Sequence, residues 1–119
     1  NRNDDFLPLI SELIEFDHLV FSSPVYWYSM SAQLKTFFDR LSDLLTIEKG
    51  LGRALKGKSF SVLSTGVNNE LPPCFIQPFE LTADYMHLTY KGCDYVSIQS
   101  ESDFKKIKKC VAHAVGKLK

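Results

Sequence analysis

Short apolar runs alternate with longer segments of helical periodicity along the chain. The apolar runs are Leu19–Phe21, Phe60–Leu63 and two pieces, 88–90 and 95–98, that are separated at Gly92. Turn-forming residues bound these runs, which is typical of buried strands. Because strands that alternate with helices usually form a parallel sheet covered on both faces, the pattern predicts an α/β fold.

Apolar residues recur at helical spacing in four segments around these strands. The expected helices cover about 5–16, 30–45, 75–86 and 102–118. Ser29 or Ser31 is expected to cap the second helix. Between this helix and the next strand, Gly50, Gly52 and Gly57 predict a connecting loop. Three strands are few for a sheet that needs both faces covered, so we expect further strands in front of this chain.

The composition limits the possible partners. The 119 residues include 14 Lys and Arg and 14 Asp and Glu, so the formal net charge is zero. Nucleic-acid-binding domains usually carry a basic face, and no such excess is present. A hydrophobic content of 45% indicates one globular domain over residues 1–119. Because no apolar run reaches the roughly 20 residues of a membrane span, we expect neither a nucleic acid nor a membrane as partner.

The side chains that commonly bind metals are scattered. The three cysteines form no C-x-x-C motif and are Cys74, Cys93 and Cys110. We interpret them as reduced thiols of a cytoplasmic protein. The three histidines, His18, His87 and His113, pair with no Cys or carboxylate at ligand spacing. We therefore expect no metal site, and a local hydrogen bond for His18.

The C-terminal segment is basic. It carries six lysines, which are Lys105, Lys106, Lys108, Lys109, Lys117 and Lys119. Lysines opposite an apolar helix face usually form a solvated surface, and docking of an anionic partner is the alternative interpretation.

Two segments combine small polar residues with Pro or Gly directly after a predicted strand. The first runs from Ser22 to Ser29 and includes Tyr26, Trp27 and Tyr28, and the second covers 64–70. In α/β sheets, ligands bind beyond the carboxyl ends of the strands, where both segments are expected. A flat aromatic ligand is one interpretation of the three aromatics. Packing beneath the neighbouring helix or in a subunit interface is the other.

The stretch SPVYWYSMSAQLK from Ser23 to Lys35, followed by FDR at 38–40, closely resembles the NADPH-dependent FMN reductase family. This group includes the multimeric flavodoxins and the iron–sulfur flavoproteins. The resemblance extends over essentially the whole chain and also includes Lys91-Gly92-Cys93 and the closing helix. It implies a flavodoxin-like three-layer αβα sandwich with a parallel sheet, and non-covalently bound FMN.

The resemblance also implies which residues contact the flavin. They are Ser23, Pro24, Val25, Tyr26, Trp27, Tyr28 and Ser29 on one side of the ring, and Ser64, Thr65 and Gly66 on the other. Hydride would pass from NAD(P)H through FMN to a small acceptor. The flavin supplies the redox chemistry, so no catalytic side chain is assigned.

Members of this family begin with a strand and a phosphate-cradling loop, and neither stands in front of Asn1 in this sequence. We therefore expect an N-terminally incomplete domain, with FMN bound weakly or not at all by this chain alone. The edge of Leu19–Phe21 would lie bare, which predicts a homo-oligomer or pairing with an N-terminal piece. The alternative function is a module without flavin that serves in interaction or structure. A second register, with 64–69 as a flavodoxin phosphate loop, fits poorly because Pro72-Pro73 delays the helix.

Overall fold

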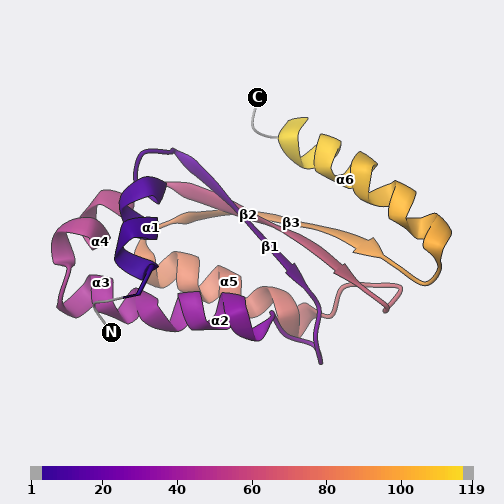
Figure 1. Ribbon diagram of the computed structural model, residues 1–119, viewed down its shortest axis with the longest axis horizontal. Coiled ribbons are helices and arrows are strands. Elements are labelled where there is room, and N and C mark those ends of the chain that lie inside the picture. The colour runs from indigo at the N-terminus through magenta and orange to yellow at the C-terminus, as the bar shows by residue number, and fades with distance from the viewer. Residues whose placement is uncertain (1–3, 117–119) are drawn as a thin grey trace.

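A three-stranded parallel sheet forms the middle layer of the protein (Figure 1). The computed structural model describes residues 4–116. The strands are β1 (His18–Pro24), β2 (Ser59–Gly66) and β3 (Thr89–Ser97), in the order β1-β2-β3. Both pairs of neighbouring strands are parallel, as the alternating sequence pattern predicted. All three carboxyl ends therefore lie at the same edge of the sheet.

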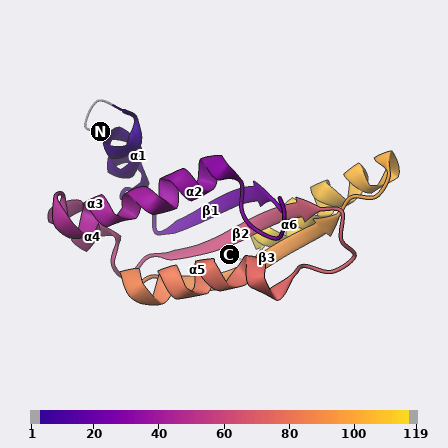
Figure 2. The same cartoon turned by 90° about the horizontal axis from the view of Figure 1, so that it is seen from below.

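Helices cover both faces of this sheet. On one face, α2 (Ala32–Asp39) and α5 (Pro73–Met86) run side by side, and α6 (Phe104–Gly116) lies on the other face (Figures 1 and 2). The α1 helix (Phe6–Leu13) lies near the amino ends of the strands, beside α3 (Asp43–Thr46) and α4 (Lys49–Leu55). This is the three-layer flavodoxin-like αβα arrangement that the resemblance implied.

The main core fills the space between the sheet and the α2–α5 layer. Phe60 and Val62 point to this face from alternate positions of β2, and Phe75 and Phe79 meet them from α5. All four side chains are essentially inaccessible to solvent. The ring of Phe21 lies edge-on against Phe60, with ring centroids 5.4 Å apart. Apolar residues with a period of two in β2 thus fix which face of the sheet packs against the α2–α5 layer.

A second core cluster lies at the amino end of the sheet. Its fully buried members come from α1, α3, α4 and α5, and they are Phe6, Ile10, Leu44, Leu55 and Met86. This cluster anchors the short helices α3 and α4, which could not be stable in isolation.

The loop predicted around Gly50 and Gly52 is wrong, because both residues lie inside α4. A Cβ atom at Gly52 would lie 2.4 Å from the backbone oxygen of Leu44, so this glycine permits close packing of α4 on α3. The helix expected over 30–45 is also interrupted. It consists of α2, a 3-10 turn at Arg40–Ser42, and α3.

The predicted break at Gly92 is a bulge within one continuous strand. The pairing of β2 with β3 changes register between Phe60 and Val62, and Gly92 has a φ of 106°. Glycine adopts this conformation without the steric penalty that a Cβ atom brings.

The ends of the chain follow the predictions only in part. The first helix ends at Leu13 instead of near Phe16. In α6, the lysines at 105, 106, 108 and 109 are exposed, whereas Lys117 and Lys119 lie outside the described residues. No helix within residues 4–116 has the length and apolar character needed to cross a membrane.

Candidate functional site

The aromatic segment after β1 forms a tight two-residue turn. The Tyr26 N–H donates to the Ser29 oxygen at 2.9 Å, and the Ser29 N–H donates back to the Tyr26 oxygen at 3.0 Å. The two central residues, Trp27 and Tyr28, have positive φ angles of 47° and 69°. Positive φ at both central positions defines a type I′ turn, in which Asn and Gly are strongly preferred. We call residues 26–29 the aromatic turn.

The aromatic turn holds its rings out into solvent. Trp27 is 92% exposed, Tyr26 61% and Tyr28 57%. The interpretation in which these rings fill a gap beneath the neighbouring helix is therefore wrong. Bulky residues with positive φ are rare, and each costs on the order of 1–3 kcal/mol. The fold keeps a strained turn that buries little apolar surface in the chain itself, which is typical of a binding site.

Hydrogen bonds fix both ends of the aromatic turn. The buried Ser23 hydroxyl accepts from the Ser31 N–H at 2.9 Å and donates to the Pro24 oxygen at 2.8 Å. The Ser31 hydroxyl in turn accepts from the Leu34 N–H at 3.2 Å and caps α2, as expected for one of the two candidate serines. On the strand side, the Val25 N–H donates to the Thr65 oxygen at 2.7 Å. The sheet and the start of α2 therefore maintain the strained conformation of the aromatic turn.

The loop after β2 lies directly beside this turn. A Cβ atom at Gly66 would lie 2.8 Å from the Tyr95 hydroxyl and 3.2 Å from Val25 Cβ. Because Gly66 has no Cβ atom, the side chains of Tyr95 and Val25 can approach its backbone closely, and a ligand could do the same. The Tyr95 hydroxyl donates to the Asn68 oxygen at 2.7 Å, and burial raises the pKa of Tyr95. Tyr95 could not be predicted as part of the site, because nothing in the pattern of β3 separates it from an ordinary strand tyrosine.

The structure brings the ten predicted site residues together at the carboxyl ends of β1 and β2. The hydrogen bonds described above, which involve Ser23, Val25 and Thr65, fix the backbone on both sides of the aromatic turn. Ser64 is buried, and its hydroxyl has no hydrogen-bond partner among residues 4–116. The candidate site thus consists of an exposed aromatic turn, a neighbouring glycine loop and one buried hydroxyl that no group within residues 4–116 pairs.

The donors that remain free in this region fit the rim of a flavin ring. Among the described residues, the N–H groups of Trp27, Tyr28, Val67 and Asn68 donate to no acceptor. Carbonyl oxygens and ring nitrogens at the edge of an isoalloxazine ring accept such bonds, and the exposed rings offer flat apolar faces. No Lys or Arg occurs in 24–31 or 66–72, so these loops offer no cation to a phosphate group.

His18 lies away from this site, at the amino end of β1. Its ring nitrogens lie 2.6 Å from the Ser59 hydroxyl and 3.0 Å from the Ser61 hydroxyl, which confirms the predicted local hydrogen bond. Burial, and then the charge of Lys91, lower the pKa of His18. Within residues 4–116, no three His, Cys, Asp or Glu side chains gather in a metal-binding group.

Comparison with known proteins agrees with this geometry. The sequence model of the NADPH-dependent FMN reductases matches residues 1–101. The chain belongs to this family. Among the curated family relatives is YwqN of Bacillus subtilis (strain 168), which carries the name putative NAD(P)H-dependent FMN-containing oxidoreductase. It is 32% identical over 95 residues, which cover 75% of this chain and 51% of YwqN. The chain thus spans about half the length of this FMN reductase relative.

Solved structures show the same fold. The Trp repressor binding protein from Bacillus subtilis superposes with a TM-score of 0.80 at 26% identity, over 93% of this chain and 70% of that protein. General stress protein 14 from Treponema denticola, solved in complex with FMN, gives a TM-score of 0.68 at 19% identity. That match covers 98% of this chain and 72% of the Treponema protein. At this lower identity the match supports the flavodoxin-like fold of the FMN reductase family.

Replacing Tyr95 with Phe is expected to loosen the loop after β2 without unfolding the protein. The variant loses the bond to the Asn68 oxygen, and a single hydrogen bond of this kind contributes about 1 kcal/mol. Urea unfolding should report a loss of that size, and amide exchange should become faster at Ile98, whose N–H donates to the Gly66 oxygen at the start of this loop. Equal exchange rates in both proteins would contradict a role for Tyr95 in holding this loop.

Proposed function

We propose that this chain is part of an FMN-dependent oxidoreductase that transfers hydride from NAD(P)H to a small acceptor. The observation that carries the proposal is the aromatic turn, in which two bulky residues with positive φ hold exposed rings beside the free N–H groups of 27–28 and 67–68. Family membership supports the same conclusion.

Each part of the site has a defined task in this proposal. The ring of Trp27 or Tyr28 covers the face or edge of the isoalloxazine ring, and the backbone N–H groups bind its polar rim. Ser64, Thr65 and Gly66 border the other side. Bound FMN supplies the redox chemistry, which is transfer of a hydride equivalent between NAD(P)H and the acceptor. The protein orients the ring and holds water away from the covered face.

An absorbance spectrum tests the proposed function. The gene product that contains this chain is purified and its visible spectrum recorded before and after FMN is added. We expect a protein-bound flavin band, and bleaching of that band by NADH or NADPH in the absence of oxygen. A colourless protein that retains no FMN would overturn the proposal and would favour the alternative of an interaction module.

The 119-residue chain by itself is expected to bind FMN weakly, and with little preference over riboflavin. No cationic side chain occurs in the loops at 24–31 and 66–72, so the phosphate gains no charge-assisted hydrogen bond there. Calorimetry with the two ligands should give dissociation constants within roughly a factor of three, which corresponds to less than about 0.7 kcal/mol. Tighter binding of FMN by tenfold or more, about 1.4 kcal/mol, would show that this chain holds the phosphate.

We also propose that the chain self-associates through β1. Among the described residues β1 pairs only with β2, so its other edge is open, and Val20 on this strand is 43% exposed. Open apolar strand edges favour pairing with another chain. Light scattering should show a dimer or larger species that Val20→Lys converts to monomer. A sharp monomer mass for the unmodified chain would contradict the proposal.

A further inference from the structure

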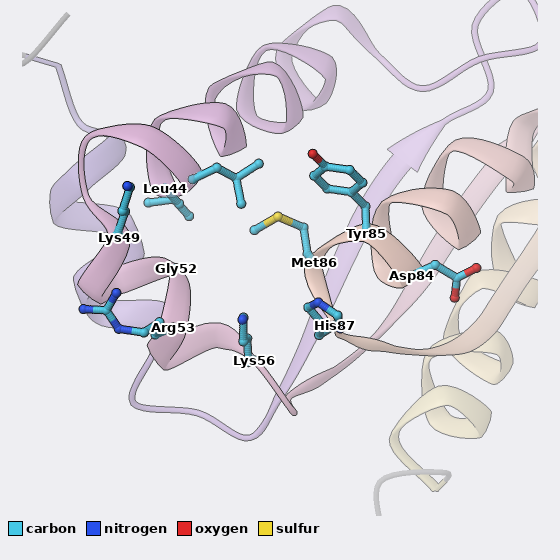
Figure 3. A pocket seen from close by; sticks show the side chains of 10 residues that line it. Leu44, Lys49, Gly52, Arg53, Lys56, Asp84, Tyr85, Met86 and His87 are labelled. Carbon is cyan, nitrogen blue, oxygen red and sulfur yellow. The ribbon is translucent and has the colours of Figure 1, made fainter.

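A hollow, shown in Figure 3, lies beside α3 and α4, at the opposite end of the sheet from the loop between β1 and α2 (Figure 1). It has a volume of about 650 Å³ and lies between α3, α4 and the C-terminal end of α5. Small-molecule sites usually have volumes of about 300–1,000 Å³. Lys49, Lys56 and His87 form its rim, Leu44 and Met86 its floor, and Tyr85 one wall. We call it the basic hollow.

The floor and wall of the basic hollow are apolar. Leu44 and Met86 belong to the second core cluster and are almost completely buried, so the floor is rigid. The ring of Tyr85 is 71% exposed and faces α3 across the hollow (Figure 3). An exposed aromatic ring above a firm apolar floor offers a flat surface for a ligand ring.

Cationic side chains outnumber acidic ones around the hollow. Lys49 and Arg53 lie on α4 and Lys56 directly follows it, and within residues 4–116 no acidic side chain forms an ion pair with them. Asp84 is the one acid at the hollow among the described residues, and its carboxylate points away from it, as does the guanidinium of Arg53 (Figure 3). The two ammonium groups of Lys49 and Lys56 therefore remain available to an anion.

Some of the carbonyl groups at the helix ends beside the hollow are already paired. The Ala83 and Asp84 oxygens of α5 accept the N–H groups of Leu88 and His87, and the Leu55 oxygen of α4 accepts from Lys58. Carbonyl groups that are already paired compete less for a lysine side chain. Together with the excess of cationic side chains, this makes the local potential favourable for an acidic group of a ligand.

We propose that the basic hollow binds a small organic anion. Its apolar body, the size of about two fused rings, lies on Tyr85 and Met86, and its carboxylate, sulfonate or phosphate group meets Lys49 and Lys56. The separation from the aromatic turn makes this site independent of the flavin site. A negative result for this site would therefore leave the proposed oxidoreductase function unaffected.

Two probes that differ by one charge test this site. 1-Anilinonaphthalene-8-sulfonate carries the anionic group, and N-phenyl-1-naphthylamine has the same rings without it. Each is titrated by fluorescence into the 119-residue chain, with and without excess riboflavin, which has the flavin ring but no anionic group. We expect saturable binding of the sulfonate that riboflavin does not displace. Absence of saturable binding, or displacement by riboflavin, would overturn the proposal, because displacement would place the probe at the aromatic turn.

Matched lysine variants test whether the ammonium groups of Lys49 and Lys56 bind the sulfonate group. Lys49→Gln combined with Lys56→Gln is expected to weaken sulfonate binding by about fivefold to tenfold and to leave the neutral probe unchanged. The control combines Lys105→Gln and Lys108→Gln, which remove the same charge from exposed positions of α6. If both double variants lose the same affinity for the sulfonate, the effect comes from the net charge of the protein, and the proposal is overturned.

A third variant separates a ligand site from a protein interface. Tyr85→Ala removes the wall and should weaken both probes, while the oligomeric state in sedimentation velocity should not change. If the chain is a dimer that Tyr85→Ala dissociates, and the sulfonate does not bind to it, then the hollow is occupied by a second copy and the proposal is wrong.

Discussion

Replacing Trp27-Tyr28 by Asn-Gly is expected to stabilise the fold and to lower flavin affinity at least tenfold. Asn and Gly adopt the positive φ angles of this turn readily, so the variant releases much of the strain of about 1–3 kcal/mol that each of the two residues carries. The same change removes two exposed rings, each of which contributes about 1 kcal/mol or more to stacking on a flat ligand. Urea unfolding measures the first effect, and a flavin absorbance titration the second.

The single variants and one distant control complete this test. Tyr28→Gly alone should give part of the stability gain, and Trp27→Asn alone part of the affinity loss. Phe16→Ala removes another exposed aromatic ring outside the site and should leave flavin affinity unchanged. A double variant that is less stable than the original chain, and that binds flavin as well, would show that the turn serves folding and not binding.

Gly52→Ala is expected to destabilise the chain, whereas Gly50→Ala, two positions away in α4, should stabilise it. A Cβ atom at Gly52 would lie 2.4 Å from the Leu44 oxygen, and overpacking of this kind costs about 1–3 kcal/mol. At Gly50 the nearest neighbour is the end of Arg53, 3.9 Å away, so alanine gains only its helix propensity of about 1 kcal/mol.

Denaturant unfolding of the two alanine variants therefore separates packing from propensity. Their unfolding free energies should differ by about 2 kcal/mol or more, with Gly50→Ala the more stable. Similar stabilities would mean that α3 and α4 are packed less closely than the structure shows. Gly52→Ser should behave like Gly52→Ala, since its Cβ atom meets the same oxygen.

The strands and the layer order could be predicted because they depend on local apolar patterns. Phe60–Leu63 is a short, mostly apolar run bounded by turn formers, and such a run is typical of a buried strand. The α4 helix could not be predicted, because glycines normally indicate a loop. Only the position of the Leu44 oxygen in space reveals why a glycine is needed at position 52.

The candidate site was predictable in its residues but not in its conformation. The motif from Ser23 to Lys35 located both loops, and the structure places them side by side. Nothing in the letters YWYS indicates a type I′ turn, because aromatic residues are rare in that conformation. Whether the three aromatic rings pack inside the chain could therefore not be predicted from the sequence. Tyr95 also escaped prediction, since its bond to Asn68 joins residues 27 positions apart.

Fluorescence of Trp27 tests the central claim most directly. It is the single tryptophan of the 119 residues and is 92% exposed, so its emission reports on the aromatic turn alone. The chain is titrated with FMN, and N-acetyltryptophanamide under the same conditions corrects for light absorption and collision. We predict saturable quenching beyond that of the free analogue, with the same midpoint as the change in the flavin spectrum. Quenching identical to that of N-acetyltryptophanamide would contradict a flavin site at the aromatic turn.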